Sequence, residues 1–134
     1  MPLRNTQNIV VIAHDKKKEE LMDFLVEREA WLWSRNLVAT GRTAEYLEQR
    51  KFKVPLIHKS PARYGGYNQI TEMIGEGEVA MVIFMQDLEV QLPYHPDIEN
   101  LLKAVDDHNV PLATNSASAE LMIIGLIRME QASE

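Results

Sequence analysis

The stretch NIVVIAHDKKK, residues 8–18, joins an apolar run to a histidine, an aspartate and three lysines. Apolar runs of this kind, without alternation, are typical of strands that are buried on both faces in parallel sheets. Lysines at the start of a helix oppose its positive N-terminal dipole unless an anion lies nearby. The stretch therefore predicts a buried strand that ends either at an anion site or in a solvated basic turn capped by Asp15.

Four further apolar runs follow along the chain, and segments with helical spacing separate them. The alternation of strands and helices indicates βαβ units and a parallel sheet. We therefore expect an α/β fold, a three-layer sandwich with helices on both faces of a five-stranded parallel sheet, in a single domain spanning residues 1–134. The expected strands are 8–13, 36–40, 54–58, 79–85 and 110–114, and the expected helices are 16–29, 43–51, 68–77, 97–109 and 116–130.

The composition is that of a globular chain, with 46% hydrophobic and 25% charged residues. A formal net charge of -6 argues against nucleic-acid and membrane partners, because both need a basic protein face. The chain has no cysteine, and His95 beside Asp97 lacks the other ligands of a metal site, so we expect no metal and no cofactor. The sequence has neither a signal-peptide pattern nor a membrane-helix pattern, and we expect a cytoplasmic protein.

A loop after the second apolar run carries groups that suit an oxyanion. In open parallel sheets, ligands bind at the carboxyl ends of the strands, where helix N-termini converge. The loop reads Thr40-Gly41-Arg42-Thr43, and its hydroxyls and backbone amides join a guanidinium that can bind phosphate through two hydrogen bonds. The alternative role for Thr43 is a plain N-cap of the next helix.

A second candidate anion loop is KSPARYGGYNQ, residues 59–69. Ser60 supplies a hydroxyl, and the adjacent glycines Gly65 and Gly66 allow a ligand to approach the backbone closely. A flexible surface turn is the alternative. Lys18 lies near enough to the end of the first strand to bind the same anion.

Three aspartates, Asp15, Asp87 and Asp97, each fall at the end of an expected strand or the start of an expected helix. Acids that converge on one cleft raise one another's pKa and can supply a general base or acid. Asp97 also fits the N-cap position of the expected helix 97–109. These carboxylates are therefore the catalytic candidates that the residue pattern offers.

Taken together, these motifs resemble those of the methylglyoxal synthase family, lyases that convert glycerone phosphate into methylglyoxal and inorganic phosphate. The likeness covers essentially the whole chain, and the combination of motifs is much more specific than any one of them. The matching segments are AHDKKK (13–18), ATGRT (39–43), the glycines at 65–66, VIFMQD (82–87), HPDI (95–98) and VPLATNSASAE (110–120).

The resemblance implies the family's fold and a homo-oligomer, commonly a hexamer. The same fold occurs in regulatory domains of carbamoyl-phosphate synthetase and in a cyclohydrolase domain of purine synthesis, so the fold alone does not decide activity. By resemblance, the pocket residues are His14, Asp15 and Lys18, the phosphate-binding residues are Thr40, Gly41, Thr43 and Ser60, and the site carboxylates include Asp87 and Asp97.

The chain departs from the family pattern where the chemistry takes place. The family's catalytic base is an aspartate directly after the glycine pair, and Tyr67 stands there in this sequence. The family histidine of the PHxPD pattern is replaced by Tyr94, with His95 next to it, and Arg42 replaces a threonine of the phosphate loop. A tyrosine with its usual pKa near 10 is only about 0.1% ionised at neutral pH and is therefore a poor base.

These departures lead to three hypotheses. The leading one is a protein that binds phosphate or a small phosphorylated metabolite with weak or lost lyase activity. The second is an active methylglyoxal synthase in which Asp15, Asp87 or Asp97 substitutes for the missing base. The third is a regulatory module in which Tyr67, Tyr94 and Arg42 bind a nucleotide or another protein.

Overall fold

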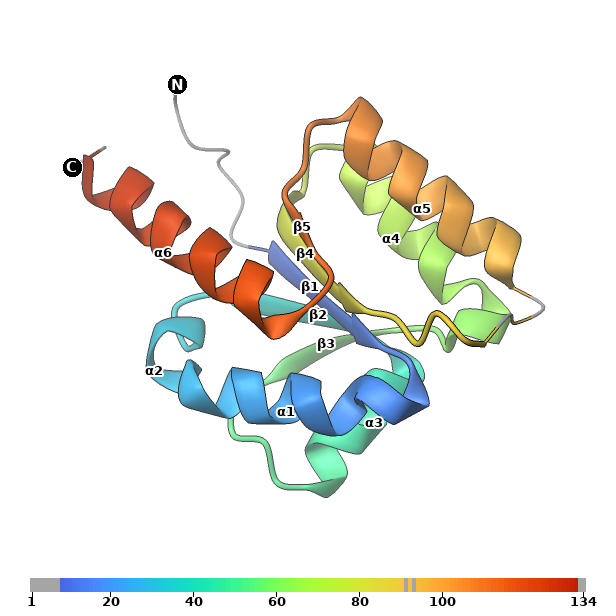
Figure 1. Ribbon diagram of the computed structural model, residues 1–134, viewed down its shortest axis with the longest axis horizontal. Helices are drawn as coiled ribbons and strands as arrows, with labels where there is room; N and C mark the ends of the chain where they lie inside the picture. The colour runs from blue at the N-terminus through green and yellow to red at the C-terminus, as the bar shows by residue number, and fades with distance from the viewer. Residues whose placement is uncertain (1–7, 91, 93, 133–134) are drawn as a thin grey trace.

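The computed structural model describes residues 8–90, 92 and 94–132, and its centre is a five-stranded parallel sheet in the order β3-β2-β1-β4-β5. Helices cover both faces of the sheet (Figure 1), which confirms the predicted α/β fold. The strands are β1 (Asn8–Ala13), β2 (Asn36–Thr40), β3 (Leu56–Lys59), β4 (Val79–Met85) and β5 (Leu112–Ala113). The helices are α1 (Lys18–Glu27), α2 (Glu29–Leu32), α3 (Gly41–Gln49), α4 (Gly66–Gly75), α5 (His95–Asp107) and α6 (Ser116–Ala132), with short 3-10 helices η1 (Asp15–Lys17) and η2 (Ala62–Tyr64).

Strand β1 is buried on both faces, as its unbroken apolar run predicts. Ile9 and Val11 point into the core shared with α1, α3 and α6, whereas Val10 and Ile12 point into the core shared with α4 and α5. Successive strand residues face opposite sides, so a strand between two helical layers needs apolar residues at every position. The strand pairs with β2 on one edge and with β4 on the other.

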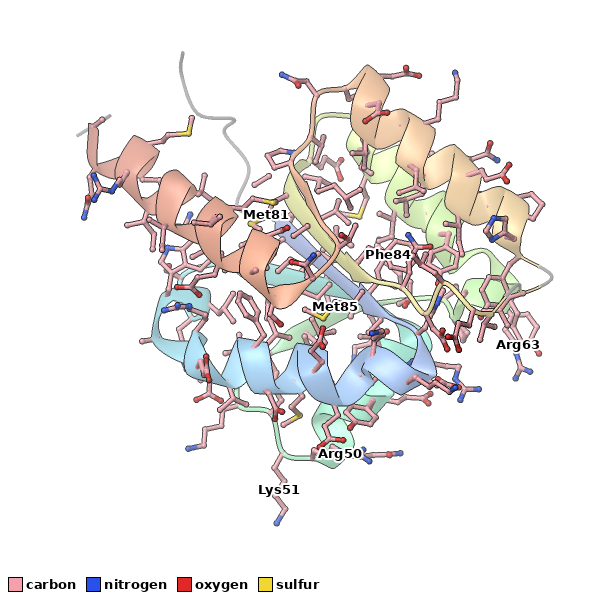
Figure 2. The ribbon with its side chains drawn as sticks, viewed as in Figure 1. Arg50, Lys51, Arg63, Met81, Phe84 and Met85 are labelled. Carbon is pink, nitrogen blue, oxygen red and sulfur yellow. The ribbon has the colours of Figure 1, made fainter. Side chains whose placement is uncertain are left out.

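Strand β4 repeats this division between the two cores (Figure 2). Met81 and Met85 lie on the side of α1 and α6, and Phe84 lies on the side of α4 and α5. All three side chains are at most 1% exposed. Full burial of a side chain of this size contributes about 1.5–3 kcal/mol to the free energy of unfolding, which fixes the register of the strand.

Some element boundaries differ from the sequence-based expectation. Strands β3 and β5 begin directly after Pro55 and Pro111, two residues later than expected, because proline has no N–H to donate to the sheet. The expected helix 16–29 is divided into η1 and the helices α1 and α2. No helix in the described part of the chain combines the length and the apolar character needed to cross a membrane.

The prediction that Asp97 is the N-cap of its helix is wrong. Helix α5 begins at His95, with Tyr94 in the capping position. Pro96 lies in the first turn, where its fixed φ angle suits a helix and its missing N–H costs nothing. Asp97 therefore lies within the first turn, where its carboxylate still interacts favourably with the helix dipole.

The glycine pair forms a tight entry into α4. Gly65 has a φ of +90°, in the left-handed region that glycine adopts without strain. A Cβ atom added at Gly66 would lie 2.0 Å from the carbonyl oxygen of Ser60. Gly65 is thus required by its backbone conformation, and Gly66 by backbone packing between the loop after β3 and the start of α4.

We predict that Gly66→Ala lowers the free energy of unfolding by at least about 2 kcal/mol, because the added methyl group overlaps a backbone oxygen that cannot move freely. Gly75→Ala is the matched control, since a Cβ there meets nothing within 4 Å and alanine favours a helix. Urea denaturation measures both variants. Equal midpoints for the two variants would show that the close approach at Gly66 is not limiting.

Candidate functional site

A pocket of about 440 Å³ lies at the carboxyl ends of β1, β2 and β4. The chain runs from β1 to β2 and β3 on one side of the sheet, and then crosses to β4 and β5 on the other. The pocket therefore lies where the strand order reverses, which is the usual ligand site of open parallel sheets. Of the predicted site residues, it is lined by His14, Asp15, Lys18, Thr40, Arg42, Thr43, Tyr67, Asp87 and Tyr94.

The predicted residues Gly41, Ser60, Gly65 and Gly66 are not among the pocket-lining residues but form the wall behind it. The Gly41 N–H donates to the Ser60 carbonyl oxygen at 3.3 Å. The Gln69 side chain accepts from the Ser60 N–H at 2.8 Å and donates to the Ser60 hydroxyl at 3.1 Å. These bonds hold the loop after β3 against α3 and α4.

The structure brings together two of the three predicted carboxylates. Asp15 and Asp87 line the pocket, whereas the half-buried Asp97 on α5 is not among its lining residues. The pKa of Asp15 is not raised by neighbouring acids, although the residue pattern predicted this. The hydrogen bond from Lys18 lowers the pKa of Asp15, and Arg42 adds to this effect. The ionised Asp15 carboxylate therefore offsets part of the positive charge of Lys18 and Arg42.

Lys18 is buried at the base of the pocket, although it is a lysine at the start of a helix. Its ammonium group donates to the Ala13 carbonyl oxygen at 2.7 Å and to Asp15 Oδ1 at 2.9 Å. Burial lowers the pKa of Lys18, and the hydrogen bond to Asp15 opposes this shift by favouring the charged form. An ammonium group has three N–H donors, so one remains for a ligand.

Two threonines connect the second strand and helix α3 to the end of β1. The Thr43 hydroxyl accepts from the Ala13 N–H at 3.3 Å, and the Thr40 hydroxyl donates to Thr43 Oγ1 at 3.4 Å. Both threonines are buried at the pocket floor. Helix α3 begins at Gly41, so Thr43 lies inside its first turn and is not its N-cap. The Gly41 N–H donates to Ser60, and the other N–H groups of this first turn have no acceptor within the helix, which suits an anion.

His14 has a defined tautomer, because the Asp87 N–H donates to its Nδ1 atom at 2.8 Å. The proton of the neutral ring is therefore on Nε2, which is buried and finds no partner among the described residues. Burial lowers the pKa of His14, and the positive charge of Lys18 acts in the same direction. His14 thus presents a neutral N–H donor to the pocket.

Tyr67 forms part of the pocket wall and is only 2% exposed. Its ring stacks on Phe84 with a centroid distance of 5.5 Å and meets the Tyr94 ring at 5.5 Å. Burial raises the pKa of the Tyr67 phenol, and the proximity of Tyr94 raises it further. A tyrosine is already a poor base at its usual pKa, so Tyr67 remains a protonated aromatic group at neutral pH.

Tyr94 lies near the opposite charges at the mouth of the pocket. Burial raises its pKa, as does the carboxylate of Asp15, whereas the charges of Arg42 and Arg63 act in the opposite direction. Arg42 Nη2 lies 3.4 Å from Asp15 Oδ2. The pocket mouth therefore carries two guanidinium groups around one tyrosine.

The sequence patterns assigned no site role to the six other lining residues, which are Ala13, Lys16, Ala62, Arg63, Val90 and Leu92. Arg63 lies in the candidate anion loop of residues 59–69, and its cationic side chain within that loop was the available signal. Val90 and Leu92 belong to the connection between β4 and α5, where no periodic pattern marks apolar residues as pocket walls. Within the described residues, no group of three His, Cys, Asp or Glu side chains is arranged to hold a metal ion.

We predict that His14 stays neutral at pH values where an ordinary histidine is half protonated. Because burial lowers its pKa in the folded state, the unfolded chain binds this proton more readily, and stability falls as the pH decreases below about 6.5. Titration of the imidazole nitrogens by NMR measures the pKa, and His14→Gln identifies the signal. A His14 signal that titrates at or above the ordinary value would contradict the buried, unpaired Nε2 atom.

Comparison with known proteins gives the same family as the sequence motifs. Residues 9–114 match the family model described as MGS-like domain. The chain is 39% identical over 127 residues to the methylglyoxal synthase of Cupriavidus taiwanensis, with 94% of each chain covered. It is 40% identical over 122 residues to that of Caldicellulosiruptor saccharolyticus, with 90% of this chain and 85% of the relative covered.

A solved structure supports the same conclusion. The crystal structure of methylglyoxal synthase from Elizabethkingia anophelis matches with a TM-score of 0.81 and 28% sequence identity. The match covers 90% of this chain and 78% of that chain. With its parallel sheet and a pocket at the switch point, the chain belongs to the MGS-like domain family of the methylglyoxal synthases.

Proposed function

We propose that this protein binds phosphate or a small phosphorylated metabolite of the glycerone phosphate type, and that its lyase activity is weak or lost. The observation that carries the proposal is Tyr67, a buried aromatic residue in the pocket wall at the position where the family resemblance implies an aspartate base. Binding and catalysis depend on different residues of this pocket, so one is retained while the other is reduced.

Four side chains support the binding of an oxyanion. Lys18 offers a cation, and His14 offers the N–H of its Nε2 atom. Thr40 and Thr43 offer hydroxyls that rotate toward a ligand by giving up their long bonds to Thr43 Oγ1 and to the Ala13 carbonyl oxygen. These donors come from two neighbouring strand ends and are held by hydrogen bonds to the backbone or to each other. A phosphate that accepts from them avoids leaving a buried N–H group unpaired.

Loss of the base accounts for the weak activity. The family reaction removes a proton from carbon before phosphate leaves, and a positioned base typically contributes about 10²- to 10⁴-fold to such a step. A buried phenol whose pKa is raised accepts no proton at neutral pH. The ring of Tyr67 also occupies space that a shorter aspartate would leave open to the substrate.

The binding half of the proposal predicts a measurable affinity for inorganic phosphate and glycerone phosphate by isothermal titration calorimetry. Lys18→Met is expected to reduce this affinity at least about tenfold, because it removes the buried cation and its charge-assisted hydrogen bond. Lys51→Met is the matched control, since Lys51 lies at the end of α3 and is remote from the pocket (Figure 2). Absence of heat with both ligands would disprove the proposed function.

The catalytic half predicts that Tyr67→Asp increases methylglyoxal formation from glycerone phosphate by about 10²-fold or more, because it restores a carboxylate to the position of the base. Tyr67→Phe, which keeps the ring and removes the hydroxyl, is expected to stay at the wild-type level. A colorimetric methylglyoxal assay measures all three proteins. Wild-type turnover equal to that of Tyr67→Asp would disprove the loss of activity.

One observation favours the alternative of an active methylglyoxal synthase. Asp87 is buried in the pocket wall, and its N–H group is fixed by the bond to His14. A second bond, from the Glu89 N–H to Asp87 Oδ1 at 3.1 Å, holds the carboxylate. If wild type forms methylglyoxal and Asp87→Asn abolishes this while still binding phosphate, Asp87 replaces the missing base.

A further inference from the structure

The pocket carries more positive charge than a single phosphate-binding site requires. Its lining includes four cations and two carboxylates, in a chain whose net charge is -6. Lys18 lies at the base, whereas Lys16, Arg42 and Arg63 are largely solvent-exposed or at the rim. The excess of cations at the rim is therefore separate from the buried donors that suit the phosphate.

Arg63 is an exposed rim cation without an acidic partner among the described residues. It forms no ion pair with any residue within 8–90, 92 and 94–132, and its guanidinium lies 5.0 Å from the centre of the Tyr64 ring. The residue lies in η2, directly before the turn at Gly65, at the edge of the molecule (Figure 2). A guanidinium on a pocket rim presents a planar pair of donors that matches a phosphate or a carboxylate.

Arg42 also lies at the pocket mouth, since its charge and that of Arg63 both lower the pKa of Tyr94, and it is held by an acidic side chain. Asp15 accepts from Arg42 at 3.4 Å and from Lys18 at 2.9 Å, so one carboxylate bridges the rim and the base. The Arg42 contact is long and largely exposed, and such pairs contribute at most about 1 kcal/mol. A ligand anion can therefore take the place of Asp15 on Arg42 at little cost.

The size and the aromatic wall of the pocket limit what else fits. A volume of about 440 Å³ lies in the range of pockets that enclose drug-sized ligands, and a three-carbon phosphate ester fills only part of it. The faces of Tyr67 are already covered, by Phe84 on one side and by Tyr94 near the other. A nucleobase therefore finds no free ring of Tyr67 on which to stack, and a second anion is the better match for the rim.

We propose that the natural ligand carries two anionic groups, a phosphate bound at Lys18, Thr40 and Thr43 and a second phosphate or carboxylate bound at Arg42 and Arg63. This inference rests on the proposed function, because it assumes that the buried donors bind the first phosphate. It adds a class of ligand, a small bisphosphate or a phosphorylated acid, that a pocket for a triose monophosphate would not require.

The test uses two matched ligand pairs, because the spacing of the two anionic groups is a separate variable. Glycerol 3-phosphate is compared with 3-phosphoglycerate, which adds one carboxylate, and fructose 6-phosphate with fructose 1,6-bisphosphate, which adds one phosphate, by calorimetry at one ionic strength. We expect at least one doubly anionic ligand to bind about tenfold more tightly than its partner. In Arg63→Gln this preference is expected to fall about fivefold, while the affinity for the monophosphate changes less than about twofold.

Arg50→Gln is the matched control for the arginine variant. Arg50 follows α3, far from the pocket, and its guanidinium lies over the Tyr46 ring much as Arg63 lies over Tyr64 (Figure 2). Its removal changes the net charge equally and should leave the preference intact. Adenosine monophosphate is titrated as a further ligand.

Each outcome separates the inference from the proposed function. If monophosphates bind but neither pair shows tighter binding of the doubly anionic ligand, the second anion-binding site is disproved and the proposed function is retained. No binding of any phosphate ester would overturn both. Tighter binding of adenosine monophosphate than of either doubly anionic ligand, or an equal loss of preference in Arg50→Gln, would also overturn the inference.

Discussion

Strand β1 is hydrogen-bonded on both edges and buried on both faces, and the rest of the structure is arranged around this constraint. Because β2 and β4 both pair with β1, their carboxyl ends are brought to the same edge of the sheet. The alternating cores above and below β1 fix its register, since a shift of one residue would exchange its two faces. The position of every polar loop at the pocket follows from this single strand.

Short hydrogen bonds convert that arrangement into a defined site. The Asp87 N–H fixes the His14 ring across the gap between β1 and β4, and Thr43 joins helix α3 to the backbone of Ala13. Lys18 is held by Ala13 and by Asp15. Groups that are held before the ligand arrives lose little conformational freedom on binding, so the donors of His14 and Lys18 are preorganised.

Tyr67 shows how packing sets the protonation state of a side chain in the pocket wall. Its neighbours Phe84 and Tyr94 form an aromatic wall that stabilises the pocket but withdraws the phenol from water. The same burial that favours packing disfavours ionisation, because a phenolate in an apolar environment loses its solvation. The hydrogen bonds that hold the donors for an oxyanion run to Ala13, Asp15 and Asp87, and none of these bonds involves Tyr67.

The sequence by itself determined the sheet, its helical layers and the loops that carry the site. A strand that is buried on both faces requires a continuous apolar run, and the polar residues that end each run mark the strand ends. It also marked the substitution at position 67. Only the tertiary structure decided that Asp97 lies outside the pocket lining, that the glycines and Ser60 support the wall, and that Arg63 joins Arg42 at the rim. Those outcomes depend on side-chain direction and on contacts between distant segments, which local sequence patterns do not encode.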